Sequence, residues 1–415
     1  MDKKKQILII SFFFQPFNTI GAVRVSYFVK YLQDKDYIVH IVTAMRENHL
    51  NLNIAKDINT YYVRWPNADK LLNLSDKFPK CKLIWFLSRV LNKIFIPSAT
   101  RLPEGSIYFW RQFAYKKARI IIKNNNISLI YTSSGPVSSA IIGSKLTQKY
   151  NIPWIPEFRD LWALNPYNGL NENKRNKQLK IEKKYLAHAK HIITVTNGFK
   201  NIIESIHKQK VSVIYNGYSD ITVNDKTHNQ RLTIIHLGTI YKNKRDPSIL
   251  FNAVNQLKNE NKITENDLTI KFYGSSNNYI KDLIEQYNIP QFVEICKTVS
   301  KNEALEIQKK SDVLLLLQWN NKNDRAIPGK LFEYMAYQKP ILAICYPGEI
   351  KQILDKTSTG KVITELDEMK NFILNSVQNY KHNPSLGFQF MQKEIIKYSR
   401  KYQNKKLEEI IKKYI

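Results

Sequence analysis

The chain alternates short apolar runs with longer amphipathic stretches, a pattern typical of βα units around parallel sheets. In the first half the apolar runs predict strands, and the stretches between them have the spacing of helices. The expected strands are residues 7–14, 37–42, 61–65, 128–132, 154–158, 191–195 and 211–215, and the expected helices are 22–32, 107–123, 137–149 and 174–187. The fold class that follows is α/β.

A polar stretch at 220–231 interrupts the pattern and is the best candidate for a linker. We therefore expect one Rossmann-like domain at 1–222, a second at 223–390, and a C-terminal helix at 391–415 that returns to the first domain. Open parallel sheets bind ligands at the carboxyl ends of their strands, so we expect a cleft there between the domains. After the linker the expected strands are 232–237, 268–273, 313–317 and 341–345, and the expected helices are 247–257, 279–286, 301–309, 330–336 and one or two within 388–415.

Composition excludes several classes of protein. Of the 415 residues, 43% are hydrophobic and 12% aromatic, which is enough to bury real cores and excludes global disorder. No apolar run approaches the roughly 18 residues of a membrane-spanning helix. The 64 Lys and Arg against 35 Asp and Glu give a formal charge of +29. This charge favours nucleic acid, an anionic membrane surface or phosphorylated substrates as partners, or it reflects a Lys-, Asn- and Ile-rich composition with solvated charges.

The N-terminus resembles a signal peptide, because lysines at 3–5 precede an apolar run at 7–14. No small-residue cleavage site follows that run, and we interpret it as a buried first strand that ends at Pro16. The three cysteines, Cys81, Cys296 and Cys345, are too far apart to predict a disulfide framework or a metal pair. These features favour a reducing, cytoplasmic location.

Two segments carry residues suited to phosphate. Gly21 allows close approach of the backbone after the first strand, and Arg24 lies one turn further on, although a lone glycine here is usually only a tight turn. In the second half, Pro328 fits the first turn of a helix and places Gly329 and Lys330 at its positive end, where an anion binds favourably. A Lys-Glu pair on an ordinary helix is the structural alternative for this segment.

The loops after two strands of the second half strengthen the ligand interpretation. Gly238 and Gly274 each follow a buried strand and place flexible backbone at the expected cleft. The cations Lys242, Lys244 and Arg245 follow Gly238 in a short loop. Together these loops predict a pocket for a nucleoside diphosphate.

The motifs, taken in order, resemble the retaining GT-B glycosyltransferases of family four, of the type that builds bacterial capsule, exopolysaccharide and O-antigen. The resemblance spans nearly the whole chain. It rests on residues 9–16 with Gly21 and Arg24, and on 131–136, 155–162, 195–198, 216–217 and 329–336. It implies two Rossmann-like domains whose parallel sheets face each other across a cleft.

The resemblance also implies roles for individual residues. It places Arg245 and Lys330 on the donor diphosphate, Glu333 on the ribose, and Asp160 at the acceptor or the sugar. The family usually carries a further Glu eight positions before Glu333, but here that position is Arg325, with Asp324 beside it. The remaining implied residues are Gly21, Arg24, Gly238, Lys242, Gly274, Val299, Asp324 and Gly329 toward the donor, and Arg159 and Asn216 on the acceptor side.

The implied activity is transfer of a sugar, with retention, from a nucleoside-diphosphate sugar, expected to be a UDP-sugar, to a saccharide or lipid-linked saccharide. No cofactor and no metal are expected. Asp34 and Asp36 form a D-x-D that we interpret as a turn after a helix. His188 and His191 straddle a helix end and a strand start, which makes a shared metal improbable.

Residues 80–97 are apolar over most of their circumference, with Lys82, Arg89 and Lys93 on one side. This segment fits either a helix docked on an anionic inner membrane surface, near a polyprenyl-diphosphate-linked acceptor, or a helix packed on its own domain. Two other functions remain open. A GT-B-fold nucleotide-sugar epimerase would share the architecture, and a basic nucleic-acid-binding protein would show a cationic stripe interleaved with aromatics, which is absent.

Overall fold

The computed structural model describes residues 4–17, 19–45, 53–65, 107–219, 229–242, 244–274 and 278–415. Its contacts divide the chain into two compact units. The first comprises Met1–Tyr215 together with Gln403–Ile415, and the second comprises Asn216–Tyr402. The expected linker falls mostly on residues 220–228, and the amphipathic segment 80–97 entirely on residues outside the described ranges.

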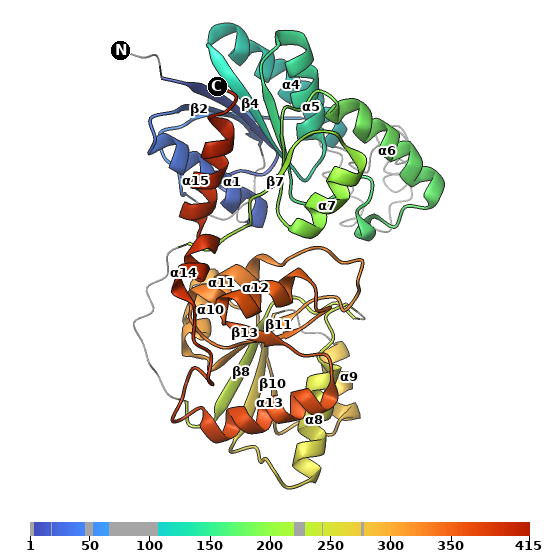
Figure 1. The fold of residues 1–415 in the computed structure, drawn as a ribbon, viewed down its shortest axis with the longest axis vertical. Coiled ribbons are helices and arrows are strands. Elements are labelled where there is room, and N and C mark those ends of the chain that lie inside the picture. The colour runs from blue at the N-terminus through green and yellow to red at the C-terminus, as the bar shows by residue number, and fades with distance from the viewer. Residues whose placement is uncertain are drawn as a thin grey trace, which may run out of the picture. The chain divides into compact units, whose positions relative to one another are not determined.

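The N-terminal unit contains a seven-stranded parallel sheet in the order β3-β2-β1-β4-β5-β6-β7 (Figure 1). The apolar N-terminal run forms the central strand β1, which is buried along most of its length, so the interpretation as a first strand is confirmed. The strands are β1 (Gln6–Ser11), β2 (Ile38–Ala44), β3 (Asn59–Val63), β4 (Ile127–Ser134), β5 (Trp154–Phe158), β6 (Ile192–Thr194) and β7 (Val211–Val213).

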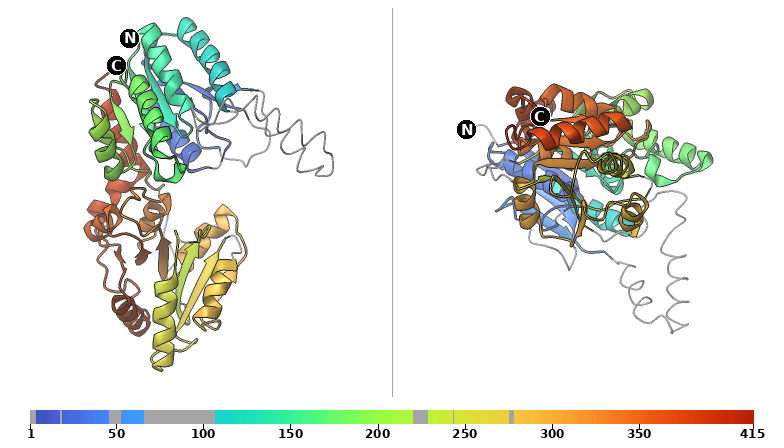
Figure 2. Two further views of the ribbon diagram at one scale, coloured as in Figure 1. Left: turned by 90° about the vertical axis from the view of Figure 1, so that its right-hand side faces the viewer. Right: turned by 90° about the horizontal axis from the view of Figure 1, so that it is seen from below.

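Helices cover both faces of this sheet. Apolar side chains of α1 and of the C-terminal helix α15 pack on one face, beside Ile7 and Ile9 of β1. Figure 2 shows the C-terminal end of the chain beside this unit. The helices of the unit are α1 (Ile20–Gln33), α4 (Ile107–Asn124), α5 (Ser138–Tyr150), α6 (Glu172–Leu186), α7 (Asn197–Ile206) and the last part of α15 (Arg400–Ile411), with a short 3-10 turn η1 (Pro166–Asn168).

The second unit contains a six-stranded parallel sheet in the order β10-β9-β8-β11-β12-β13. In both sheets the third, second and first strands precede the fourth, which is the Rossmann order. The strands are β8 (Leu232–Leu237), β9 (Leu268–Tyr273), β10 (Val293–Cys296), β11 (Val313–Leu317), β12 (Ile341–Ile344) and β13 (Gly360–Val362). The α/β fold with two Rossmann-like parallel-sheet domains is thereby confirmed.

One apolar cluster packs α8, α9 and α13 against one face of this sheet, while α11 and α12 lie on the other (Figure 1). Strand β11 is a continuous apolar run and β8 is mostly apolar, as expected for strands buried on both faces. The helices are α8 (Ser248–Asn259), α9 (Asn278–Gln286), α10 (Lys301–Lys310), α11 (Gly329–Ala336), α12 (Glu349–Thr357), α13 (Leu366–Asn379) and α14 (Gln392–Ile395), followed by a 3-10 turn η2 (Ile396–Tyr398).

Candidate active site

The structure brings together three of the expected donor residues at the carboxyl ends of β8 and β9. Gly238 and Gly274 have φ angles of +128° and +147°, which favour glycine. A Cβ on Gly274 would lie 2.6 Å from the carbonyl oxygen of Gly238, so the two loops pack directly on each other. A Cβ on Gly238 would overlap the Lys330 ammonium, which donates to the carbonyl of Leu237. Both glycines are therefore required by close packing around Lys330.

Lys330 lies in the first turn of α11. Pro328 occupies the N-cap with φ −65° and ψ 138°, one position before the expected one, and no side chain caps the helix. The amides of Gly329 and Lys330 therefore remain available to an external acceptor at the positive end of the helix dipole, whereas that of Leu331 donates to the carbonyl of Pro328 at 3.0 Å. Glu333 lies one turn further along and is half-buried. The segment thus combines a lysine, free helix amides and a carboxylate over one turn.

Partial burial lowers the pKa of Lys330. Desolvation, together with the nearby charge of Arg245, lowers the pKa of Lys330 to about 8, and Glu333 opposes this shift in part. His236 on β8 is buried, and its Nδ1 lies 3.0 Å from the carbonyl oxygen of Leu315. Burial and the charge of Lys330 lower the pKa of His236 to about 3, so it stays neutral. A bound anion would raise the pKa of Lys330 again, because it would favour the charged ammonium.

The loop after β8 holds its cations over aromatic rings. The ammonium of Lys242 lies 5.8 Å from the ring centre of Tyr279, and that of Lys244 lies 5.1 Å from the ring of Trp319. The guanidinium of Arg245 lies 4.9 Å from the ring of Tyr241 and donates to the carbonyl of Thr239 at 2.8 Å. The sequence motif contained these cations and Tyr241, but the partners of Lys242 and Lys244 come from α9 and the loop after β11 and could not be paired from spacing.

The remaining expected donor residues have contacts within their own loops. The carboxylate of Asp324 accepts from Gln318 Nε2 at 2.5 Å and from the amide of Ala326 at 3.1 Å. It stabilises the loop before α11, and this geometry gives no support to a sugar contact. Arg325 is exposed. Val299 lies between β10 and the capping box that Ser300 and Glu303 form at the start of α10.

In the N-terminal unit Arg24, an expected donor residue, is held by buried partners of its own unit. Its guanidinium is buried and pairs with Glu157 of β5, with Nη2–Oε1 2.7 Å and Nε–Oε1 2.9 Å. It also donates to the carbonyls of Ile214 at 2.8 Å and Tyr215 at 2.6 Å, at the end of the unit. These hydrogen bonds connect α1 and β5 to the segment that follows β7.

Glu157 is the centre of this buried network, and the sequence motif that contains it did not reveal this role. Its second oxygen accepts from Ser133 Oγ at 2.8 Å. Burial alone would raise the pKa of Glu157, but Arg24 and the hydrogen bonds of Tyr131 and Ser133 outweigh it and lower that pKa. Glu157 is therefore ionised, and its charge raises the pKa of the buried Tyr131 further above that of an ordinary phenol.

Arg159 lies between two glycine backbones at the end of β5. A Cβ on Gly21 would overlap its guanidinium, and a Cβ on Gly135 would lie 3.0 Å from Nη2. Nη2 donates to the carbonyl of Gly135 at 3.0 Å, whereas Nε is buried with no hydrogen-bond partner among the described residues. Asp160 is exposed beside it, with Oδ2 3.7 Å from the position of a Gly135 Cβ. The structure thus brings together Gly21, Arg159 and Asp160.

The loop that carries Asp160 is fastened to α6. The indole of Trp162 donates to Gln178 at 3.0 Å, and the amide of Ala163 donates to Glu182 at 2.9 Å. The other oxygen of Glu182 lies 3.1 Å from Nε2 of His207, which follows α7. By contrast, Asn216 belongs by its contacts to the second unit, so the structure does not group it with Arg159.

The other candidates are ordinary structural residues. Asp34 is the C-cap of α1, and Asp36 follows with a φ angle of +62°, so the D-x-D turn is confirmed. Asp36 also pairs with Lys4 at 3.0 Å. His191 bonds to Tyr414 and Ser212 at 3.1 and 2.9 Å, while His188 is exposed. Within the described ranges, no three His, Cys, Asp or Glu side chains are placed to hold a metal ion.

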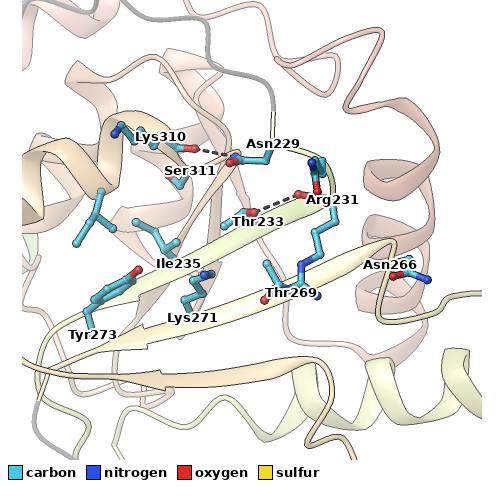
Figure 3. Close-up of a pocket in the computed structure, with 12 residues that line it drawn as sticks. Asn229, Arg231, Thr233, Ile235, Asn266, Thr269, Lys271, Tyr273, Lys310 and Ser311 are labelled. Atoms are coloured by element: carbon cyan, nitrogen blue, oxygen red, sulfur yellow. Dashed lines mark hydrogen bonds between the residues drawn. The ribbon is translucent and has the colours of Figure 1, made fainter.

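A cavity of about 490 Å³ lies between α10 and the strands β8 and β9 (Figure 3). Lys271 and Tyr273 rise from β9 into this space, but Lys271 pairs with Glu294 at 2.7 Å. None of the expected site residues lines the cavity. The candidate donor site is therefore the loop cluster around Lys330, not this cavity.

The two Rossmann-like units, with a cation-lined site at the carboxyl ends of the second sheet, define the GT-B class of glycosyltransferases. Residues 21–220 match the model of Glycosyltransferase Family 4, and residues 231–379 match that of Glycosyl transferases group 1. The chain belongs to the family 4 glycosyltransferases. A comparison with curated protein sequences finds no match.

Solved structures of the same fold have little sequence in common with this chain. The lipopolysaccharide outer core galactosyltransferase WaaB aligns with a TM-score of 0.60 at 14% identity, over 99% of this chain and 100% of that one. Anabaena Alr3699/HepE in complex with UDP-glucose gives 0.61 at 11% identity, over 98% and 99%. A UDP-N-acetylglucosamine 2-epimerase gives 0.54 at 12% identity, over 99% and 96%.

Within the part of the chain that the structure describes, no helix has the length and apolarity to cross a bilayer.

Proposed function

We propose that this glycosyltransferase moves a sugar, with retention, from a UDP-sugar to a saccharide or lipid-linked saccharide in the synthesis of a bacterial capsule, O-antigen or exopolysaccharide. The observation that carries the donor part is Lys330, half-buried at the start of α11 against two packed glycines, with no ion-paired carboxylate among the described residues. HepE has been solved with UDP-glucose, which supports the choice of UDP.

The chemistry proposed for the donor site is electrostatic. As the bond between the sugar C1 and the diphosphate oxygen breaks, negative charge develops on the departing nucleoside diphosphate. Lys330, Arg245 and the free amides of α11 would stabilise that charge, and Glu333 would bind the ribose hydroxyls. The groups are already in place before the reaction, so little reorganisation is needed.

The acceptor side of the proposal rests on Asp160 and Arg159. The acceptor hydroxyl attacks C1 on the face that the diphosphate leaves, and its proton passes to the departing phosphate oxygen. Asp160 would hold the acceptor or the transferred sugar. No metal is expected to take part, and the protein is expected to work in the cytoplasm or at the inner face of the membrane. Residues 80–97, where we expected a membrane contact, lie outside the described ranges.

Thermal shift with UDP, other nucleoside diphosphates and nucleotide sugars tests the donor site. Loss of a charge-assisted contact costs about 1.5–3 kcal/mol, so Lys330→Ala should weaken UDP binding roughly 10- to 150-fold. Glu333→Ala should also reduce the shift. Lys351→Ala, which removes an exposed lysine paired with Asp355, is the matched control and should leave it unchanged. A wild-type protein that no nucleoside diphosphate stabilises would contradict the proposal.

An epimerase is the alternative that the third structural neighbour represents. The two reactions differ in their products, because transfer releases UDP only when an acceptor is present, whereas epimerisation changes the UDP-sugar without acceptor. Mass spectrometry of the nucleotide sugar after incubation with the enzyme alone separates them. The match of both halves to glycosyltransferase family models favours transfer.

A further inference from the structure

Helix α6 concentrates positive charge on its exposed surface. Only one acidic residue of this helix, Glu172, is exposed; the other, Glu182, is buried and bonds to Ala163 and His207. We define the cationic face of α6 by its six exposed basic residues, which are Lys174, Arg175, Lys177, Lys180, Lys183 and Lys184.

Several other helices pair lysines with carboxylates three or four residues away, whereas α6 does not. Lys309 pairs with Glu306 at 2.7 Å, Lys351 with Asp355 at 2.5 Å, and Lys412 with Glu408 at 2.9 Å, each three or four residues away. Among the described residues, none of the six cations of α6 has a carboxylate within ion-pairing distance. The charge of this face is therefore available to an external anion.

The helix geometry separates a buried stripe from the cations. Gln178, Glu182 and Leu186 repeat every four residues and are buried against the unit. At 100° per residue, Lys180 and Lys184 point to the opposite side. Figure 1 and the right-hand view of Figure 2 show α6, in green, projecting from the body of the N-terminal unit. Lys177, Lys180 and Lys184 thus lie opposite the buried stripe and face solvent.

The same helix holds the loop of the candidate acceptor residues. Trp162 donates to Gln178, and its ring stacks on that of Tyr185 at 6.4 Å with an interplanar angle of 16°. Tyr167, in the turn between this loop and α6, is 46% exposed. An amphipathic aromatic of this kind suits the boundary between water and lipid. A partner docked on α6 would therefore lie next to the loop of Arg159 and Asp160.

We propose that the cationic face of α6 docks the protein on the surface of an anionic lipid bilayer. This proposal adds to the proposed function the surface at which a lipid-linked acceptor is reached. It rests on the proposed function only for the existence of that acceptor. A cluster of four to eight cations on a surface helix is typical of binding to anionic headgroups. Single-stranded nucleic acid would instead need a series of exposed aromatics for base stacking. On α6 itself the one aromatic, Tyr185, is stacked on Trp162, and Tyr167 lies in the turn before the helix and not among its cations.

Cosedimentation of the full chain with vesicles tests this docking. The probes are vesicles of phosphatidylglycerol mixed with phosphatidylcholine, and of phosphatidylcholine alone, at low and high salt. The variant Lys177→Glu/Lys180→Glu/Lys184→Glu keeps helix propensity, because Glu and Lys are similar helix formers. The matched control Lys281→Glu/Lys393→Glu/Lys401→Glu changes the net charge equally at three exposed positions of the second unit.

We expect wild-type binding to anionic vesicles that high salt abolishes. Each lysine near such a surface contributes about fivefold to partitioning, so the α6 variant should lose on the order of 100-fold or more. The control should lose less than about threefold. UDP should still stabilise the α6 variant, which separates a failure of docking from a failure of the donor site.

Three results would overturn the docking proposal: no binding of the wild type to anionic vesicles, equal binding to neutral vesicles, or an equal loss in the control. Tighter, α6-dependent binding to single-stranded DNA than to vesicles would assign the face to nucleic acid instead.

Discussion

The candidate cation Arg24 of the N-terminal unit and the candidate cations Lys330 and Arg245 of the second unit are held in opposite ways. In the N-terminal unit, Arg24 is buried against Glu157 at 2.7 Å and donates to two carbonyls as well. In the second unit, Lys330 donates to a carbonyl, and Arg245 contacts a carbonyl and an aromatic ring. Neither has a carboxylate within ion-pairing distance among the described residues. The charge of Arg24 is neutralised by a carboxylate of the protein, whereas Lys330 and Arg245 keep a positive charge that favours an anion.

The partners of a cation distinguish structural cations from ligand-binding cations in this protein. A guanidinium paired with a buried carboxylate would have to break that pair to bind a ligand, which is costly. A carbonyl or a ring holds a cation in place without cancelling its charge. We therefore expect Arg24 and Glu157 to determine stability, and Lys330 and Arg245 to determine ligand affinity.

The largest effect should come from breaking the buried pair. Glu157→Leu leaves Arg24 as an unpaired buried charge and should lower the free energy of unfolding by about 3–5 kcal/mol. Chemical denaturation followed by fluorescence measures it, and Lys4→Ala, which breaks the exposed pair with Asp36, should cost less than about 1 kcal/mol. The double variant Arg24→Met/Glu157→Leu should regain part of the loss. Equal, small losses in all variants would contradict the comparison.

Gly238→Ala should disrupt the donor site with less effect on folding. The new Cβ would overlap the Lys330 ammonium at a φ of +128°, so the lysine must move and UDP affinity should fall at least about tenfold. Gly169→Ala is the matched control, since Gly169 also has positive φ, +58°, but no atom within 4 Å of a Cβ. Titration calorimetry measures both. Unchanged UDP affinity in Gly238→Ala would remove Lys330 from the site.

The pKa of Lys330 predicts how UDP affinity depends on pH. The free protein holds this pKa at about 8, below its ordinary value, and a bound diphosphate raises it again because it favours the ammonium. Affinity should therefore stay constant below pH 8 and fall by up to about tenfold per pH unit above it, with proton uptake on binding. Calorimetry in buffers of different ionisation enthalpy detects that proton. In Lys330→Ala the profile should be flat, and a falling profile there would assign the effect to another group.

The smallest effect should come from the ring under Arg245. Tyr241→Leu removes a cation–π contact worth about 0.5–1 kcal/mol, so UDP affinity should fall about two- to fivefold. Tyr402→Leu removes another exposed tyrosine, 39% exposed, and serves as the control. The same titration compares them. Equal affinities of the two variants would show that the ring does not position Arg245.

Much of the fold could be predicted because buried parallel strands are continuous apolar runs. The expected ranges 154–158, 232–237, 268–273 and 313–317 coincide with β5, β8, β9 and β11. The edge strands β10 (Val293–Cys296) and β13 (Gly360–Val362) were not predicted, since they are short and only partly apolar. The helices α7, α12 and α13 were missed as well, although their buried residues have helical spacing.

For the site, the sequence determined which segments carry glycine, cations and carboxylates, because these follow the ends of recognisable strands. Which of these charges remain unpaired depends on contacts between distant segments. Arg24 and Glu157 are 133 residues apart, and Lys330 meets Leu237 across 93 residues. Such pairings arise when strands from distant parts of the chain become neighbours in a sheet, and the local spacing of residues does not predict them.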